Sequence, residues 1–234
     1  MQLAQILFSQ GFGTRRECAG LIAAGEVQVH GQVCTDALQD YDTEGLRFVV
    51  SGQAWEFHAR ALLLLHKPAG YECSAKPSAW PPVLGLLPMP LRRRGVQPVG
   101  RLDQDTTGAL LFTDDGQLLH RLTSPKWHLP KTYQVQTEAA VTPAQIGQLL
   151  AGVVLNDSPQ PVRAAGARIT GERALELVLT EGKYHQVKRM LAAVGNPVER
   201  LHRSGVGSLA LPDGLAPGQW CWVQERALSP LGHT

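Results

Sequence analysis

The sequence has few cysteines, and none of them belongs to a recognisable pair. The four cysteines lie far apart along the 234 residues and form no C-x-x-C motif; they are Cys18, Cys34, Cys73 and Cys221. Scattered cysteines of this kind are typical of reduced thiols in a cytosolic protein rather than of a disulfide framework or a zinc site. We therefore expect a cytoplasmic protein with no bound metal.

The sequence also lacks a long hydrophobic run. Although 44% of the residues are apolar, no stretch approaches the ~18 consecutive apolar residues that a membrane span requires. The first five residues, MQLAQ, contain no basic region followed by an apolar segment, so no secretory signal is visible. These absences predict a soluble globular protein with no membrane partner, and its length suits one large domain or an ordinary domain with a small appendage.

Several motifs for catalysis and ion binding are missing. No Gly-rich loop ends in Gly-Lys-Ser or Gly-Lys-Thr, which excludes a P-loop, and the eight histidines form no H-E-x-x-H motif. The aspartates between positions 103 and 115 do not fit a calcium-binding EF-hand loop, because the spacing differs and the bidentate glutamate is absent. A carboxylate pair acting on a glycosidic bond stays open at this point, since the sequence does not give the separation of two carboxylates.

The net charge of +2 conceals three clusters of basic residues. They are Arg15 and Arg16; Arg92, Arg93 and Arg94; and the set Lys183, Lys188, Arg189, Arg200 and Arg203. Acidic residues gather instead in segments 36–44 and 103–115. Basic clusters are compatible with a polyanionic partner, but each cluster alone also fits a solvated surface.

The most informative stretch is the segment 100–108, GRLDQDTTG, which is followed by the apolar run 109–112. Two glycines bracket Arg101 and the carboxylates of Asp103 and Asp105, a pattern that favours a loop leading into a buried strand. Loops held against a buried strand commonly present reactive side chains. Asp103 is therefore a candidate catalytic residue, although a carboxylate that caps a turn has the same local pattern.

The first 56 residues are expected to form a small separate module. Two short amphipathic helices and a hairpin are predicted within residues 1–33. Thr14 and Glu17 fit a capping box at the start of the second helix. Residues 51–60 are interpreted as the linker to the rest of the chain.

Strands are expected to dominate the larger domain, residues 57–234. The predicted strands are 61–65, 131–136, 175–179, 198–202 and 206–211, and the predicted helices are 117–122, one that starts at 142–143, and 187–194. The proline-containing segment 74–98 is expected to be an irregular surface loop. Because no regular βαβ alternation appears, the sequence predicts an α+β fold built on a mixed, mainly antiparallel sheet with flanking helices.

Two stretches of the chain resemble known RNA-acting families. The segment GFGTRRECAGLIAAGEVQVHGQVC resembles the S4 RNA-binding domain, and this resemblance implies that Arg15 and Arg16 lie near RNA phosphates. The segment GRLDQDTTGALLFTDDG resembles the central motif of pseudouridine synthases. Three more segments resemble the same family in the expected order: LHKPAGYECS, SPKWHLPKTY and EGKYHQVKRMLAAVGNPVERLHRSGVGSLAL.

The resemblance is strongest to the small-subunit (16S) ribosomal RNA pseudouridine synthase A type. It implies an isomerase that converts one uridine, of the uridine-516 type, in 16S ribosomal RNA without a cofactor or a metal. It also implies a monomer whose partner is ribosomal RNA, free or within a small-subunit assembly intermediate. Two alternatives stay open: a synthase that acts on 23S ribosomal RNA or tRNA, and a non-catalytic RNA-binding ribosome-assembly factor.

The same resemblance assigns roles to individual residues. Asp103 matches the catalytic aspartate, as a nucleophile at C1′ or a base at C2′ of a flipped-out nucleotide. Tyr133 is expected to stack on the uracil, and Lys188 to pair with Asp103 and keep it ionised. Asp105 is expected to shape the loop without such partners. The residues expected to contact RNA are Arg15, Arg16, Arg92, Arg93, Arg94, Arg101, Arg121, Lys126 and Arg189.

Overall fold

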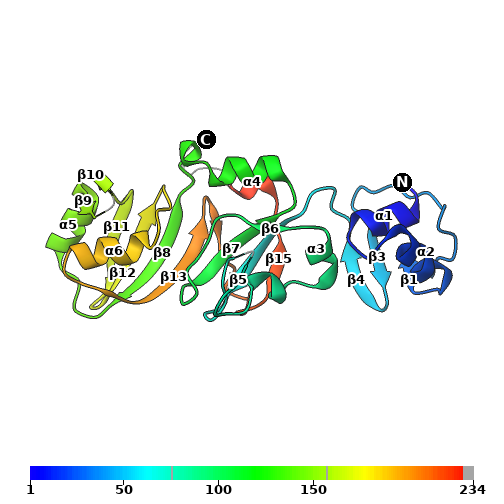
Figure 1. Cartoon of the computed structure of the whole chain (residues 1–234), viewed down its shortest axis with the longest axis horizontal. Coiled ribbons are helices and arrows are strands. Elements are labelled where there is room, and N and C mark those ends of the chain that lie inside the picture. Colours follow the sequence, from blue (N-terminus) through cyan, green and yellow to red (C-terminus); the bar gives the residue numbers. More distant parts are fainter. Residues whose placement is uncertain (75, 157, 229–234) are drawn as a thin grey trace. The chain divides into compact units, whose positions relative to one another are not determined.

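The computed structural model describes residues 1–74, 76–156 and 158–228, and these residues form two units (Figure 1). The first unit comprises Met1–Ala61 and Leu87–Gln97, and the second comprises Leu62–Leu86 and the chain from Pro98 onward. The sequence led us to expect two continuous segments that meet after residue 56. The structure differs because the segment 87–97 groups with the first unit, although it lies within the larger domain in the sequence.

The first unit is a small sheet packed against two helices. In chain order it contains α1 (Leu3–Ser9), α2 (Arg15–Ala23), β1 (Val27–Val29), β2 (Gln32–Val33), β3 (Arg47–Val50), β4 (Gln53–Glu56) and, from the later segment, α3 (Met89–Arg93). The strands are antiparallel in the order β2-β1-β3-β4. The predicted helices, hairpin and capping box of Thr14 and Glu17 are confirmed.

The predicted linker over residues 51–60 is wrong for its first half. Strand β4 pairs with β3 there, and the rings of Trp55 and Phe12 pack perpendicular to each other with 5.2 Å between ring centroids. Ser51 and Gly52 connect the two strands with φ values of 48° and 80°. Two residues with positive φ form the two-residue hairpin turn that matches strand twist, so the Ser-Gly pair was the available signal.

The predicted irregular loop over residues 74–98 is also only partly correct. It contains the short 3₁₀ helix η1 (Val83–Leu86), helix α3 and the short strand β6 (Gln97–Pro98). Leu91 of α3 is buried, with 2% of its surface exposed. The prolines at positions 88 and 90 permit this helix because a helix tolerates proline in its first turn.

The second unit is built on one large sheet. Its strands run in the order β11-β12-β8-β13-β7-β5-β15, and β13 also pairs with β14. The pair β13 and β7 is parallel, whereas the other pairs along this order are antiparallel. The predicted α+β class with a mixed, mainly antiparallel sheet is confirmed.

The strands and helices of the second unit have the following bounds. The sheet strands are β5 (Leu62–Lys67), β7 (Thr107–Thr113), β8 (Lys131–Thr137), β11 (Gly166–Gly171), β12 (Ala174–Leu179), β13 (Val198–Val206), β14 (Leu209–Ala210) and β15 (Trp220–Trp222). A separate pair consists of β9 (Val153–Leu155) and β10 (Ser158–Val162). The helices are α4 (Gly116–Thr123), η2 (Pro125–Trp127), α5 (Pro143–Ala151), α6 (Gln186–Ala193) and η3 (Glu225–Leu228).

Helices pack against two regions of this sheet. Figure 1 shows α5 and α6 near β11 and β12, while α4 lies near β7. Strands β5 and β7 are almost wholly buried, which is why their sequences, LLLLHK and TGALLFT, are nearly continuous apolar runs. Among the described residues, no helix is long and apolar enough to cross a membrane.

Candidate active site

A buried lysine organises the loop that contains Asp103. Lys67 is fully buried at the end of β5, and its Nζ atom lies 2.9–3.1 Å from the carbonyl oxygens of Pro68, Asp103, Gln104 and Thr106. Burial lowers the pKa of Lys67 from its ordinary value. Through its hydrogen bonds to these four carbonyl oxygens, the ammonium group of Lys67 holds the backbone of the loop in place. Lys67 was not among the candidate site residues that the sequence suggested.

The end of this loop lies directly against strand β13. Gly108 has a φ of 109°, and a Cβ atom there would lie 2.2 Å from the carbonyl oxygen of Arg203. The parallel register pairs Arg203 with Gly108. Only glycine permits this approach of the two backbones without displacement.

Asp103 faces two cationic or potentially cationic side chains on the α6 side. Lys188 Nζ lies 3.6 Å from Asp103 Oδ2, and His185 Nε2 lies 3.3 Å from Asp103 Oδ1. His185 precedes α6 with a φ of 47°, a left-handed conformation that is uncommon outside glycine. The side chain of Asp103 is 26% exposed, so it remains accessible to a ligand.

The expectation that Asp105 has no charged partner is wrong. Lys188 Nζ lies 2.7 Å from both carboxylate oxygens of Asp105, which is closer than its distance to Asp103. Burial alone would raise the pKa of Asp105, but the hydrogen bond and the charge of Lys188 outweigh it and hold that pKa below its usual range. Lys188 is therefore shared between two carboxylates. The two-residue spacing brings both carboxylates to one lysine because the chain turns between Asp103 and Thr106.

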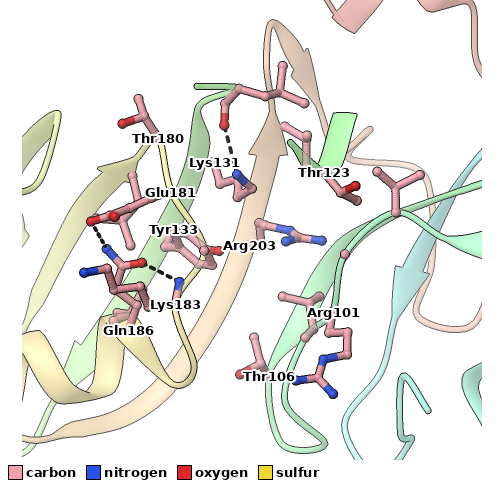
Figure 2. A pocket seen from close by; sticks show the side chains of 18 of the residues that line it. Arg101, Thr106, Thr123, Lys131, Tyr133, Thr180, Glu181, Lys183, Gln186 and Arg203 are labelled. Carbon is pink, nitrogen blue, oxygen red and sulfur yellow. Dashed lines mark hydrogen bonds between the residues drawn. The ribbon is translucent and has the colours of Figure 1, made fainter. Parts of the chain in front are cut away.

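A cavity of about 360 Å³ opens beside Asp103, wholly within the second unit. Its walls come from the loop 100–106, from β8 and β13, and from the segment between β12 and α6. Figure 2 shows Tyr133 and Arg203 on neighbouring strands, with Glu181 and Gln186 beside the tyrosine and with Arg101 and Thr106 on the other side of the view. Tyr133 is only 8% exposed, so its ring forms part of the wall.

Two further polar groups of this cavity were given no role in the site from the sequence, although Arg203 belongs to the third basic cluster. Arg203 is 3% exposed, and its Nε atom donates to the carbonyl oxygen of Ala109 at 2.6 Å. The hydroxyl of Thr106 is buried and has no hydrogen-bond partner among the described residues. A buried hydroxyl without a partner is costly, which favours a ligand that completes its hydrogen bonding.

The residues expected to contact RNA in the second unit have different surroundings. Arg101 is exposed and lines the cavity. Arg189 donates to the carbonyl oxygen of Tyr184 at 3.0 Å. Arg121 is paired with Glu225 and lies over the ring of Trp127 at 4.8 Å, whereas Lys126 is exposed. Arg121 is thus already bound within the protein.

The remaining expected RNA contacts belong to the first unit. Arg15 and Arg16 are exposed on α2, and the guanidinium of Arg15 lies 5.3 Å from the ring centre of Phe8. Arg93 forms an ion pair with Glu17, and Arg92 is exposed. Arg94 donates to the side chain of Gln10 at 2.7 Å and to the carbonyl of His58 at 2.6 Å. The structure brings Asp103, Tyr133, Lys188 and Arg101 together in one unit, but not the arginines at 92–94.

This arrangement has the elements of a site for a flat, polar ring joined to a sugar. An accessible carboxylate stands at one wall, an aromatic ring at another, and cations line the space between them. An accessible carboxylate can act as a nucleophile or as a base. The aromatic ring offers a stacking surface for a base.

Comparisons with known proteins agree with this chemistry. The profile of the family described as RNA pseudouridylate synthase matches residues 61–193. An uncharacterized RNA pseudouridine synthase from Bacillus subtilis, YtzG, is 37% identical over 100% of this chain and 99% of its own length. Ribosomal small subunit pseudouridine synthase A from Escherichia coli is 38% identical over 95% of this chain and 96% of its own length.

A solved structure gives the same result for the fold. The crystal structure of a pseudouridylate synthase superimposes with a TM-score of 0.68 at 30% identity, and the match covers 97% of this chain and 98% of that one. The chain therefore belongs to the RNA pseudouridylate synthase family, as an isomerase of the same type as its ribosomal small subunit pseudouridine synthase A relatives.

Proposed function

We propose that the protein converts one uridine of 16S ribosomal RNA, of the uridine-516 type, to pseudouridine, with Asp103 as the catalytic carboxylate. The observation that carries this proposal is the position of Asp103 at the wall of a 360 Å³ cavity that also contains Tyr133. The choice of 16S ribosomal RNA rests on the names of relatives that are 36–38% identical over nearly their whole length.

The reaction breaks the bond between C1′ and N1, turns the uracil and joins its C5 to C1′. A uridine within folded RNA must first leave the helix to reach the cavity. Asp103 then attacks C1′ or removes a proton from C2′, and Lys188 and His185 lie within 3.6 Å of its carboxylate. Tyr133 stacks on the uracil while it turns. All the steps use this chain's own side chains, without a cofactor.

The first unit is proposed as an S4-like RNA-binding domain. Its order of two helices and a hairpin agrees with that assignment, and Arg15 and Arg16 lie exposed on α2. RNA phosphates are contacted most strongly by arginine, because its guanidinium donates two parallel hydrogen bonds. Neutralising Arg15 and Arg16 should therefore weaken RNA binding uniformly and reduce its salt dependence. We further propose a cytoplasmic monomer that acts on free RNA or on an assembly intermediate.

One experiment tests the substrate and the activity together. The protein is incubated separately with 16S ribosomal RNA, 23S ribosomal RNA and tRNA, and pseudouridine is mapped at single-nucleotide resolution. The proposal predicts one new pseudouridine in 16S ribosomal RNA. Product only in 23S ribosomal RNA or tRNA would contradict the substrate, and no product in any RNA would contradict the activity.

A further inference from the structure

Two cationic side chains flank Tyr133 on the same face of the sheet. Lys131 precedes Tyr133 by two residues on β8, so the two side chains point to the same face. Arg203 on β13 is directly opposite Tyr133 in the antiparallel register. All three side chains line the cavity, and Figure 2 shows Lys131 and Arg203 beside the tyrosine ring.

Neither cation is neutralised by a carboxylate in the part of the chain that the structure describes. Arg203 uses its Nε atom to bind the carbonyl oxygen of Ala109, and no carboxylate of the described residues lies within 4.0 Å of its guanidinium. Lys131 Nζ donates to the carbonyl oxygen of Leu129 at 3.1 Å and likewise forms no ion pair there. Arg203 is buried and Lys131 is partly buried. Cations withdrawn from water without a partner charge are costly, so their retention at a cavity wall favours an anionic occupant.

The surroundings of Lys131 support this interpretation. Burial and then the charge of Arg203 lower the pKa of Lys131 to about 8, while the carboxylate of Glu181 acts in the opposite direction. Arg203 approaches Lys131 from β13, and Glu181 from the segment after β12. The two cations therefore destabilise each other, and an anion between them would relieve the repulsion.

We propose that Lys131 and Arg203 bind the negative charge that develops on the uracil ring when it separates from C1′. This inference rests on the proposed function and names two further catalytic residues for it. When the bond between C1′ and N1 breaks, its electron pair stays on N1 and spreads to O2 and O4 of the ring. The cations stabilise this anion until C5 bonds to C1′, C5 loses its proton and N1 gains one. If Asp103 attacks C1′, the ester bond that it forms breaks as C5 bonds to C1′; if it removes the C2′ proton, it returns that proton to C2′ at the same stage.

The alternative occupant is a phosphate of the target nucleotide. A phosphate carries its charge before, during and after the reaction, so binding it strengthens RNA association without favouring bond cleavage. Charge on the uracil appears only as the bond breaks, so stabilising it raises the rate of that step. If the cations bind the uracil anion, removing them should slow cleavage less for a more acidic base. If they bind a phosphate, removing them should affect all bases equally.

The test compares uridine with 5-fluorouridine at the target position of the RNA. Fluorine at C5 makes the base more acidic, and its anion needs less stabilisation by the protein. Under single-turnover conditions at saturating protein, Lys131→Met should slow cleavage of the bond to uridine by about 100-fold and cleavage of the bond to 5-fluorouridine by less than about 10-fold. Lys76→Met, an exposed lysine outside the cavity, is the matched control and should match the wild type on both RNAs.

A pH profile gives a second readout that does not depend on a charge-removing variant. The wild-type rate should fall as the pH rises through about 8, because Lys131 loses its proton there. Lys131→Arg should retain its rate over that range, since arginine stays protonated. Arg203→Lys should lower the single-turnover rate of cleavage more for uridine than for 5-fluorouridine. Arg200 is an exposed arginine on the same strand, and Arg200→Lys should change neither rate.

The outcomes separate this inference from the proposed function. Equal slowing of both RNAs by Lys131→Met, weakened RNA binding with an unchanged single-turnover rate, or identical pH profiles of the wild type and Lys131→Arg would each overturn the inference while the enzyme remains active. Absence of conversion by the wild-type protein would overturn the proposed function and the inference with it.

Discussion

The Nζ atom of Lys67 lies 2.9 Å from the carbonyl oxygen of Thr106, so a lysine at the end of one strand holds the loop that begins the next. The same ammonium group contacts the carbonyl oxygen of Asp103 at 3.1 Å. Lys67 thus holds the backbone of Asp103, the proposed catalytic residue, while the carboxylate of Asp103 faces Lys188 and His185.

Replacing Lys67 with methionine should damage both stability and turnover. The variant leaves several buried carbonyl groups without a donor, and we expect a loss of about 3 kcal/mol in the free energy of unfolding. Turnover should fall by about 100-fold in the protein that remains folded, because Asp103 is no longer held in place. Urea denaturation and single-turnover kinetics measure the two effects. Lys76→Met is the control, and a Lys67→Met variant as stable and active as that control would contradict this role.

The sharing of Lys188 between two carboxylates predicts unequal effects of two variants. Asp105→Asn frees Lys188 to move toward Asp103, so turnover should stay within about threefold of the wild type. Lys188→Met leaves Asp103 with His185 alone, and turnover should fall by at least about tenfold. The measurement is the single-turnover rate of each variant on the same RNA. A larger loss in Asp105→Asn than in Lys188→Met would show that Asp105 carries the chemistry instead.

Two glycines that border the same loop should differ in their tolerance of alanine. Gly108→Ala places a Cβ atom 2.2 Å from a backbone oxygen of β13 at a φ of 109°, so we expect a loss of about 3 kcal/mol or more. Gly100→Ala meets no atom within 4 Å of the added carbon, so only the left-handed backbone at a φ of 75° destabilises it. We expect that strain to lower the free energy of unfolding by about 1 kcal/mol. Equal losses in urea denaturation would contradict the close approach of β7 and β13.

The partly buried His202 should make the free energy of unfolding fall at acidic pH. Burial, assisted by the nearby charge of His66, lowers the pKa of His202 below its ordinary value of 6.5. The unfolded chain therefore binds a proton more readily than the folded protein, so this contribution is complete above pH 6.5 and is lost as the pH falls through the folded-state pKa.

The comparison of His202→Asn with the wild type isolates this effect. The variant should show a smaller fall in the free energy of unfolding between neutral and mildly acidic pH, measured by urea denaturation. His58, whose pKa burial also lowers, remains in both proteins and serves as a common background. An identical fall in both proteins would rule out His202 as a source of acid sensitivity.

The local pattern of the sequence was sufficient for the elements that local physics controls. The glycines and carboxylates of segment 100–108 predicted a loop before a buried strand, and β7 follows it. The helical spacing of Val187, Met190 and Leu191 predicted α6, and these residues are buried. The capping pattern of Thr14 and Glu17 also determined a helix start.

Long-range contacts account for most of what the sequence did not reveal. A lysine is usually exposed, and nothing near Lys67 in the sequence indicates that its partners lie 36–39 residues away. The same holds for Arg203, whose neighbours across the sheet are set by the parallel pairing of β13 with β7. The grouping of Arg92 to Arg94 with the first unit likewise depends on tertiary packing, so their predicted contact with RNA stays a prediction.

The most direct test of the account compares the wild type with Asp103→Asn. The substitution replaces the carboxylate of Asp103 with a carboxamide of the same shape, so folding and RNA binding should change little. The account predicts one pseudouridine in 16S ribosomal RNA with the wild type and a rate lower by at least about 10³-fold with the variant. A rate of pseudouridine formation near that of the wild type, in a variant that folds and binds RNA normally, would contradict the assignment of Asp103.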